Sequence, residues 1–372
     1  MSGTYGPGPV PGGGSVTDPG ITYTGALSSP LRYVICPSTA VWDTDVFTSS
    51  GQTLIEVPGN TEQASLTAID YGTIEIIQGG FTLDAVNLTS LTMPNVKHQT
   101  GTWNPLLPAL TTLDLSAAVG IFSGLVTWLD VSVVETLDLS SVPIIASNSF
   151  SPTMPSLASL DMSSLTTVAD GVGLDFVAAS LSSVSFPALE TGGSVAFTVD
   201  AATVVSLPAL VSCSYFNPTA GAATTVDFSA LETATADFNA VMASWVAASF
   251  PALVTCGTSF IFEGDAATSL SLAALETVAA GFTVTAASLV TVSLNAGLLS
   301  IGGNFSITGA ALSQASVNAI LVRLAALDGT GGTTSYDNMT VNLSGGTSAT
   351  PGASGLTAKT TLEGRGNTVT VN

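Results

Sequence analysis

Basic residues are nearly missing from this chain of 372 residues. Five Lys and Arg and one His stand against 26 Asp and Glu, which gives a formal net charge of −21. No Lys or Arg lies between Lys97 and Arg323. Nucleic acids and anionic membrane surfaces are both bound mainly through Lys and Arg. We therefore expect neither as a partner, and we attribute the acidic balance to solubility.

Cysteine is scarce as well, with three residues in the chain. Three cysteines are too few for a disulfide framework. Cys213 and Cys256 fall at the same position of a repeat, two copies apart, and that separation exceeds disulfide reach. We expect both to be small core residues, whereas Cys36 lies outside the repeat.

Long apolar runs are also lacking. No run of 18 apolar residues occurs, so we expect no membrane insertion. The first residues have neither a basic n-region nor an apolar h-region, so we expect no secretory signal in that stretch.

A repeat of 21–24 residues occupies positions 64–310. Each copy has an apolar anchor, in most copies a branched apolar residue two positions earlier, and in most copies another three positions later. The eleven anchors are Tyr71, Met93, Leu115, Leu139, Met162, Phe186, Leu207, Phe228, Phe250, Leu272 and Leu294.

Each copy predicts two short strands. The anchor and the residue two before it point to one face of an extended strand, while the polar residue between them points to the other. Proline follows four of the anchors and ends the strand there. A second short apolar segment comes about ten residues later, often after glycine, as in Phe260–Phe262 and Phe282–Val284.

A coil of this length cannot bury its own apolar side, but stacked coils bury one another's. We therefore predict a mainly β fold: a parallel β-solenoid of about eleven coils, with equivalent residues stacked on each other. The unit L-x-x-L-x-L-(P/S)-x-L, followed by Gly-x-φ-x-φ, resembles the leucine-rich-repeat superfamily, most closely the receptor L-domain type. The asparagine ladder of ordinary leucine-rich repeats is missing, so the resemblance implies strand–turn–strand coils.

Three further segments flank the repeat. Residues 1–20 form a Gly- and Pro-rich tail, and residues 21–63 form an N-terminal β cap or attachment segment. Residues 311–372 form a small α/β cap with a helix over 311–328, a strand over 339–343, a helix near 355–363 and a strand over 368–371. Ser313 is the expected N-cap of the first helix. Its apolar face is Val317, Ile320, Leu321, Leu324 and Leu327.

The last sixty residues carry a second resemblance. The strings L-S-Q-A-S-V-N-x-I-L, V-N-L-S-G-G-T, G-L-T-A-K-T-T-L-x-G-R-G and T-V-T-V-N look like the closing segment of bacteriophage and prophage repeat proteins. Several of those proteins are virion- or tail-associated. The resemblance implies the setting in which the protein works rather than a reaction.

Catalytic motifs are not evident. His98 is the single histidine, and no G-x-S-x-G elbow, phosphate-binding G-K-[ST] loop or zinc spacing occurs. We therefore expect no enzyme activity, no cofactor and no dedicated metal site.

The polar residues just before the anchors form an expected binding strip suited to sugar hydroxyls. Asp114, Asp138 and Asp161 stand on consecutive coils, at ~4.8 Å per coil. Solvated carboxylates are the simpler interpretation, and a Ca²⁺ ion is the alternative. The strip consists of Asp114, Asp138, Asp161, Ser185, Ser206, Asp227 and Ser249.

These observations lead to two functional expectations. The first is a non-enzymatic bacteriophage virion protein, located in the virion or outside the cell, as a tail fibre, spike or decoration subunit. It would be a homo-oligomer, bind other virion proteins through residues 1–60 and contact host surface glycans. The alternative is a secreted or surface-attached bacterial adhesin, a carbohydrate-binding repeat protein.

Overall fold

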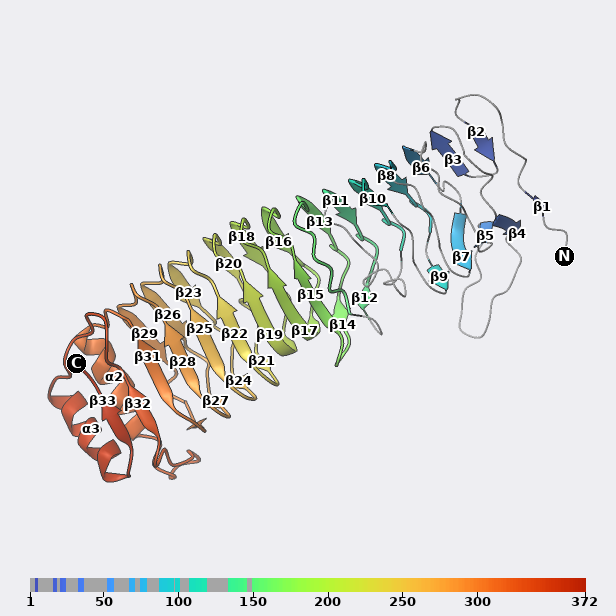
Figure 1. Cartoon of the computed structure of the whole chain (residues 1–372). Coiled ribbons are helices and arrows are strands. Elements are labelled where there is room, and N and C mark those ends of the chain that lie inside the picture. The colour runs from blue at the N-terminus through green and yellow to red at the C-terminus, as the bar shows by residue number, and fades with distance from the viewer. Residues whose placement is uncertain are drawn as a thin grey trace. The chain divides into compact units, whose positions relative to one another are not determined.

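The fold is a mainly β, parallel β-solenoid of about nine turns with two helices near the C-terminus (Figure 1). The structure is a computed structural model of residues 1–372. It describes residues 87–96, 107–118, 133–145 and 149–372, together with shorter segments before residue 87 and strand β9 (His98–Thr100). The chain divides into two compact units, Met1–Leu181 and Ser182–Asn372.

The number of turns is slightly lower than the predicted eleven. A first strand forms in every one of the eleven copies. In the copies that begin at Tyr71 and Leu115, most of the residues that lead back to the next first strand lie outside the described part of the chain. Fewer complete turns are therefore described.

The first unit begins with antiparallel pairs, in contrast to the parallel repeat. Strand β1 pairs with β4, β4 with β5, β2 with β3, and β3 with β6. Two of these strands fall within the Gly- and Pro-rich tail and pair with later strands of the same chain. The strands are β1 (Thr4–Tyr5), β2 (Val16–Asp18), β3 (Ile21–Thr24), β4 (Tyr33–Cys36), β5 (Gln52–Glu56), β6 (Ala68–Asp70) and β7 (Ile74–Gln78).

The first strands of the repeat in this unit form one parallel ladder in the predicted register. Leu113 pairs with Leu137, and Leu137 pairs with Leu160. The N–H of Leu115 donates to the Asp138 carbonyl at 3.0 Å, one coil further on. The ladder is β6, β8 (Ser90–Thr92), β10 (Thr112–Asp114), β11 (Thr136–Asp138) and β13 (Ser159–Asp161). The remaining strands of the unit are β12 (Ile144–Ile145), β14 (Thr167–Val168) and β15 (Gly173–Val177).

In the second unit the first strands form two ladders rather than one. The interruption coincides with Ala248, where a small residue replaces the branched side chain two positions before the anchor. Equivalent residues stack on each other within each ladder, as predicted. The rings of Phe228 and Phe250 also stack across the break in pairing, with centroids 6.2 Å apart and an interplanar angle of 5°. The ladders are β16 (Ser183–Ser185), β18 (Val204–Ser206) and β20 (Thr225–Asp227), then β23 (Ala247–Ser249), β26 (Ser269–Leu272) and β29 (Thr291–Leu294).

The second strands of this unit build its broadest parallel sheet. It continues through the C-terminal segment, because β32 pairs in parallel with β31 and β33 with β32. Its main strands are β17 (Thr191–Thr198), β19 (Ser212–Thr219), β22 (Phe238–Val241), β25 (Phe260–Glu263), β28 (Phe282–Thr285), β31 (Phe305–Thr308), β32 (Thr340–Asn342) and β33 (Thr368–Thr370). Shorter strands beside them are β21 (Thr233–Ala234), β24 (Thr255–Cys256), β27 (Thr277–Val278) and β30 (Ser300–Ile301).

A column of phenylalanines forms the core of the second unit. Five rings lie on successive coils with neighbouring centroids 4.5–5.0 Å apart and interplanar angles of 3–22°. Phe228 and Phe250 meet this column edge-on, each at 4.9 Å. All are at most 1% exposed, so each ring is held by rings above, below and beside it. The column is Phe216, Phe238, Phe260, Phe282 and Phe305.

The C-terminal segment has the predicted helices and strands. Helix α2 (Gln314–Ala325) begins at Ser313, whose side chain accepts from the Ser316 N–H, and it ends three residues earlier than predicted. Helix α3 (Ala353–Gly364) lies between β32 and β33 in the sequence. The expected apolar face of α2 is at most 1% exposed throughout.

We expect Phe260→Ala to lower the free energy of unfolding by about 3–5 kcal/mol, because it removes a ring stacked at 4.8 Å on both Phe238 and Phe282. Thr283→Ala, at an exposed position of the adjacent strand, should change it by less than about 0.5 kcal/mol. Chemical denaturation followed by circular dichroism compares the two. Equal effects would show that the phenylalanine column does not hold the coils together.

Candidate binding surfaces

The predicted strip is divided among three ladders. Asp114, Asp138 and Asp161 are in register on consecutive strands of the first unit. In the second unit Ser185, Ser206 and Asp227 share one ladder. Ser249 belongs to the other ladder, beside Ser271 and Ser293. None of these side chains is buried, in agreement with the predicted outward face.

Each aspartate of the strip is the last residue of its strand, and its side chain stabilises the turn that follows. One carboxylate oxygen of Asp114 accepts from the backbone N–H two residues later, at Ser116, over 2.9 Å. Asp138 and Asp161 accept in the same way at 2.9 Å, and Asp227 at 3.0 Å. This is an Asx turn, in which a side chain replaces the backbone acceptor of a turn. Adjacent carboxylates are therefore tolerated because each has its own N–H donor.

The sequence is consistent with this need for a backbone N–H two residues after the aspartate. Aspartate never occupies this position in the four copies whose anchor is followed by proline, because proline has no N–H to donate. Those copies have Thr or Ser instead. In the cap, Asn342 accepts from the Ser344 N–H at 3.0 Å, so a neutral amide can close the same turn. The proline-bearing copies have Thr92, Ser185, Ser206 and Ser249.

Within the described part of the chain, no three or more His, Cys, Asp or Glu side chains gather into a group that could hold a metal. A Ca²⁺ ion on the aspartate row remains a prediction from the sequence.

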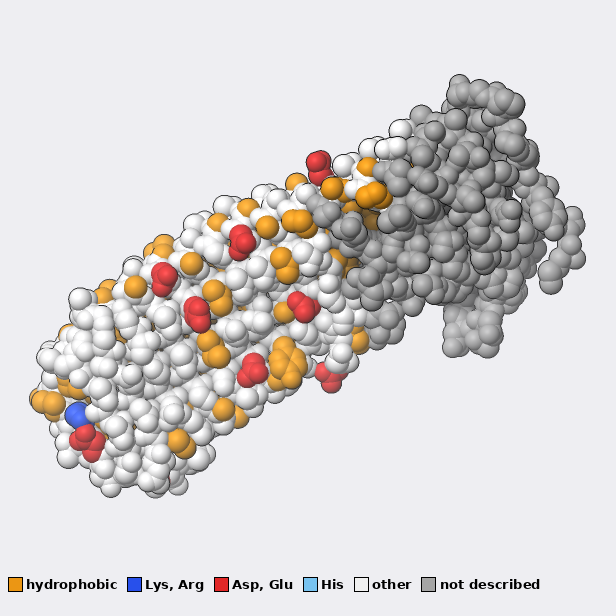
Figure 2. All heavy atoms as spheres, in the orientation of Figure 1, with side chains coloured by type: hydrophobic (Ala, Val, Ile, Leu, Met, Phe, Trp, Pro, Cys, Tyr) orange, Lys and Arg blue, Asp and Glu red, His pale blue; other side chains and the backbone are white. Residues whose placement is uncertain are grey.

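Glutamates on the second unit are spaced by aliphatic residues. Glu190, Val211, Glu232, Val254 and Glu276 follow one another on successive coils through backbone hydrogen bonds. Neighbouring carboxylates would lie ~4.8 Å apart, inside the Debye length of ~8 Å at physiological salt, whereas alternate ones lie ~9.6 Å apart. Because of the alternation, neighbouring glutamate carboxylates lie farther apart than the Debye length, so dissolved salt screens their repulsion. Figure 2 shows acidic side chains spread singly over one face of the described residues.

A broader polar surface lies on the second strands of the second unit. We call it the second-strand face. One row on it carries amides and hydroxyls on most coils, and its neighbour carries a single charged residue, Glu263. None of these side chains is buried. The first row is Ala196, Asn217, Asn239, Ile261, Thr283, Ser306, Asn342 and Thr370, and the second is Thr198, Thr219, Val241, Glu263, Thr285 and Thr308.

Tyr215 is the most prominent side chain on this face. It is 51% exposed and stands two residues before Asn217, hence on the same side of β19. Asn239 donates to the Asn217 side-chain oxygen at 3.0 Å across one coil. An aromatic ring beside ordered amides can stack on a ring and hydrogen-bond its hydroxyls. This face was not predicted from the sequence, although the exposed and buried residues alternate from Tyr215 to Thr219 as in a strand with one outward face.

The two described cysteines belong to the core, as predicted. Cys213 and Cys256 are both free and buried, two coils apart in one column with Ala234 between them. Burial raises the pKa of each thiol from its ordinary value of 9.0 to about 12. Neither thiol is therefore available as a nucleophile near neutral pH.

No protein-family model, curated protein sequence or solved structure matches this chain. No helix within the described residues has the length and apolar character needed to cross a bilayer.

Asp138→Asn should leave the free energy of unfolding unchanged, because the amide oxygen still accepts from Ser140. Asp138→Ala should lower it by about 1 kcal/mol. Thermal unfolding with and without Ca²⁺ measures both. Equal losses in the two variants, or stabilisation of the native protein alone by Ca²⁺, would show that the charge rather than the acceptor matters.

Stability should fall as the pH rises above about 9. The unfolded thiols lose protons there, whereas the folded thiols stay protonated until about pH 12. We expect a loss of about 1.4 kcal/mol per thiol per pH unit in this window. The Cys213→Ala/Cys256→Ala variant is the control, since Ala234 shows that alanine fits the column. An equal slope in the variant between pH 9 and 11 would contradict the assignment.

Proposed function

We propose that this chain is a non-enzymatic structural protein of a bacteriophage virion, a subunit of a tail fibre, spike or decoration structure. The resemblance of residues 311–372 to the closing segments of phage repeat proteins supports the setting. The uniform core supports the structural role. Every described anchor before Leu294 is at most 1% exposed, so many equivalent contacts hold the coils, as display of a surface requires.

The same proposal covers partners and location. Residues 1–60 attach the chain to other virion proteins, copies of the chain assemble into a homo-oligomer, and the protein is located in the virion or outside the cell. The repeat itself is of the leucine-rich-repeat type, related most closely to receptor L domains. The resemblance of the unit L-x-x-L-x-L-(P/S)-x-L supports this relationship.

The observation that most directly supports a display role is the second-strand face. It is polar and ordered by backbone ladders, and it carries the half-exposed ring of Tyr215 beside the hydrogen-bonded pair Asn217 and Asn239. We propose that host surface glycans are bound there, with the sugar ring on Tyr215. The predicted aspartate strip is a weaker candidate, because one oxygen of each carboxylate already closes a turn.

The alternative is a secreted or surface-attached bacterial adhesin. The same second-strand face would then bind carbohydrate, and the receptor-like repeat supports this candidate. The two functions differ in where the protein is found.

The test is fractionation of the native source. We expect the protein at a fixed copy number in phage particles purified on a density gradient, measured by mass spectrometry, with antibodies to residues 149–372 labelling those particles. Particles carrying Tyr215→Ala should adsorb to host cells several-fold more slowly, while Tyr215→Phe, which keeps the stacking ring, should adsorb normally.

Recovery of the protein only on bacterial surfaces would replace the virion assignment with the adhesin. Equal adsorption by both Tyr215 variants would remove the second-strand face as the glycan surface.

A further inference from the structure

The last anchor of the repeat is less buried than the others. The described anchors from Met93 to Leu272 are at most 1% exposed, whereas Leu294 is only half-buried. In earlier copies the anchor N–H donates to a carbonyl of the next coil, as Leu207 does to Asp227 at 2.9 Å. No coil follows Leu294, and helix α2 takes that place.

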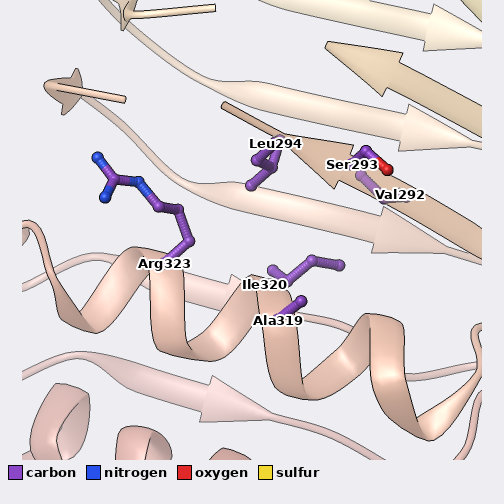
Figure 3. Close-up of a pocket in the computed structure, with 6 residues that line it drawn as sticks. All are labelled: Val292, Ser293, Leu294, Ala319, Ile320 and Arg323. Atoms are coloured by element: carbon purple, nitrogen blue, oxygen red, sulfur yellow. The ribbon is translucent and has the colours of Figure 1, made fainter. Parts of the chain in front are cut away.

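Helix α2 covers only part of this end. The buried Ser316 hydroxyl accepts from the Val292 N–H at 2.8 Å, which closes the edge of β29 at that residue. Beyond it, a cavity of about 230 Å³ opens between β29 and the helix. Figure 3 shows Arg323 and Ile320 rising from α2 toward the strand, with Leu294 opposite them. Its lining residues are Val292, Ser293, Leu294, Ala319, Ile320 and Arg323.

Arg323 is a half-buried cation without an anionic partner. Its Nη2 donates to the Leu298 carbonyl, and its Nε is buried with no hydrogen-bond acceptor. Burial lowers the pKa of the guanidinium. No carboxylate of the described residues lies within ion-pair distance of it, whereas Lys359 in the same segment pairs with Glu363.

This arrangement is unusual in a chain with 26 acidic and five basic residues. A charge moved out of water without a counter-ion is unfavourable, and a bound anion offsets that cost. The planar guanidinium matches the two oxygens of a carboxylate, and charge-assisted hydrogen bonds of this kind are the strong ones. The lining therefore selects a carboxylate for the cationic end of the cavity.

The other lining residues favour a ligand whose remaining part is small and aliphatic. The half-buried Leu294 and the exposed Ala319 present aliphatic groups to the opening, and Ser293 adds one hydroxyl. Val292 and Ile320 also line the cavity but are only 4% and 1% exposed. The volume lies below the ~300 Å³ at which pockets for drug-sized ligands begin, so one small group fits. Ser316 already occupies the strand edge at Val292, which leaves no room for a peptide to extend the sheet along β29.

We propose that this cavity binds a small carboxylate with a compact aliphatic body, its carboxylate on Arg323 and its aliphatic part between Leu294 and Ala319. This site is separate from the second-strand face and does not depend on the proposed virion role.

The test uses the full-length protein and three probes: isovalerate, its neutral analogue isovaleramide, and glucuronate, which carries a carboxylate on a polar ring. Titration is followed by calorimetry and by the methyl NMR signals of Leu294 and Ile320. It is run at about 0.15 M salt, where charges more than about 8 Å away are largely screened. We expect isovalerate to bind and to shift both methyl signals, and the other two probes to bind at least tenfold more weakly.

Three variants locate the site. Arg323→Gln should weaken isovalerate binding by at least about tenfold, the effect of losing a charge-assisted hydrogen bond. Lys359→Gln removes a positive charge of the same segment outside the cavity and should bind normally. Ala319→Leu, at an exposed helix position, should block the cavity while leaving Arg323 and the fold in place.

Isovaleramide binding as tightly as isovalerate would overturn the carboxylate assignment, and preferential binding of glucuronate would overturn the aliphatic body. Undiminished isovalerate binding by Ala319→Leu, or by folded Arg323→Gln, would place the ligand elsewhere, and failure of isovalerate to bind the native protein would overturn the proposal.

Discussion

The stacking of one coil on the next at ~4.8 Å is the constraint on which this structure depends. Each position of the repeat meets its own counterpart, so side chains that stack well recur and side chains that repel are separated. Phenylalanines form a column with parallel rings, and glutamates alternate with valines. Where backbones approach most closely only glycine fits: a Cβ at Gly257 would lie 1.9 Å from the Thr235 carbonyl oxygen.

The same constraint creates a problem wherever the stack ends, because the last strand of each ladder has no partner. Two side chains of the C-terminal segment address it. Ser316 closes the edge of β29 at Val292, and Lys359 donates to the Val369 carbonyl on the edge strand β33 at 3.0 Å. Lys359 lies on helix α3, and a helix that covers a sheet edge and a charge placed there both protect the edge against further pairing. The cavity at Arg323 lies where this closure is incomplete.

Much of the fold was predictable because its signals are periodic. The spacing of the anchors located the first strands, and the 3.6-residue pattern around Val317 and Leu324 located α2. The break in pairing between β20 and β23 was not predicted, because the spacing of the anchors continues unchanged through it and the rings of Phe228 and Phe250 still stack. The turn-closing role of Asp138 was present in the sequence, in the exclusion of aspartate before proline, but required the hydrogen bond to be recognised.

The candidate sites were harder to predict for a physical reason. The cavity brings Leu294, at the end of the repeat, to Arg323, in a segment with no periodic relation to it. The second-strand face is periodic, but its outward residues differ from coil to coil, unlike its apolar inner face. A repeat pattern reveals the buried residues that recur in every coil, whereas a binding surface consists of outward residues that vary from coil to coil.

A series of spin-label distances within the second unit tests the stacking most directly. Pairs of labels would join Asn217 to Ile261, Thr283 and Ser306 in a cysteine-free background, with separations measured by electron spin resonance. Stacked coils should give backbone separations of about 10, 14 and 19 Å, rising by ~4.8 Å with each coil. Separations that do not rise in equal steps along this row would contradict the stacked solenoid.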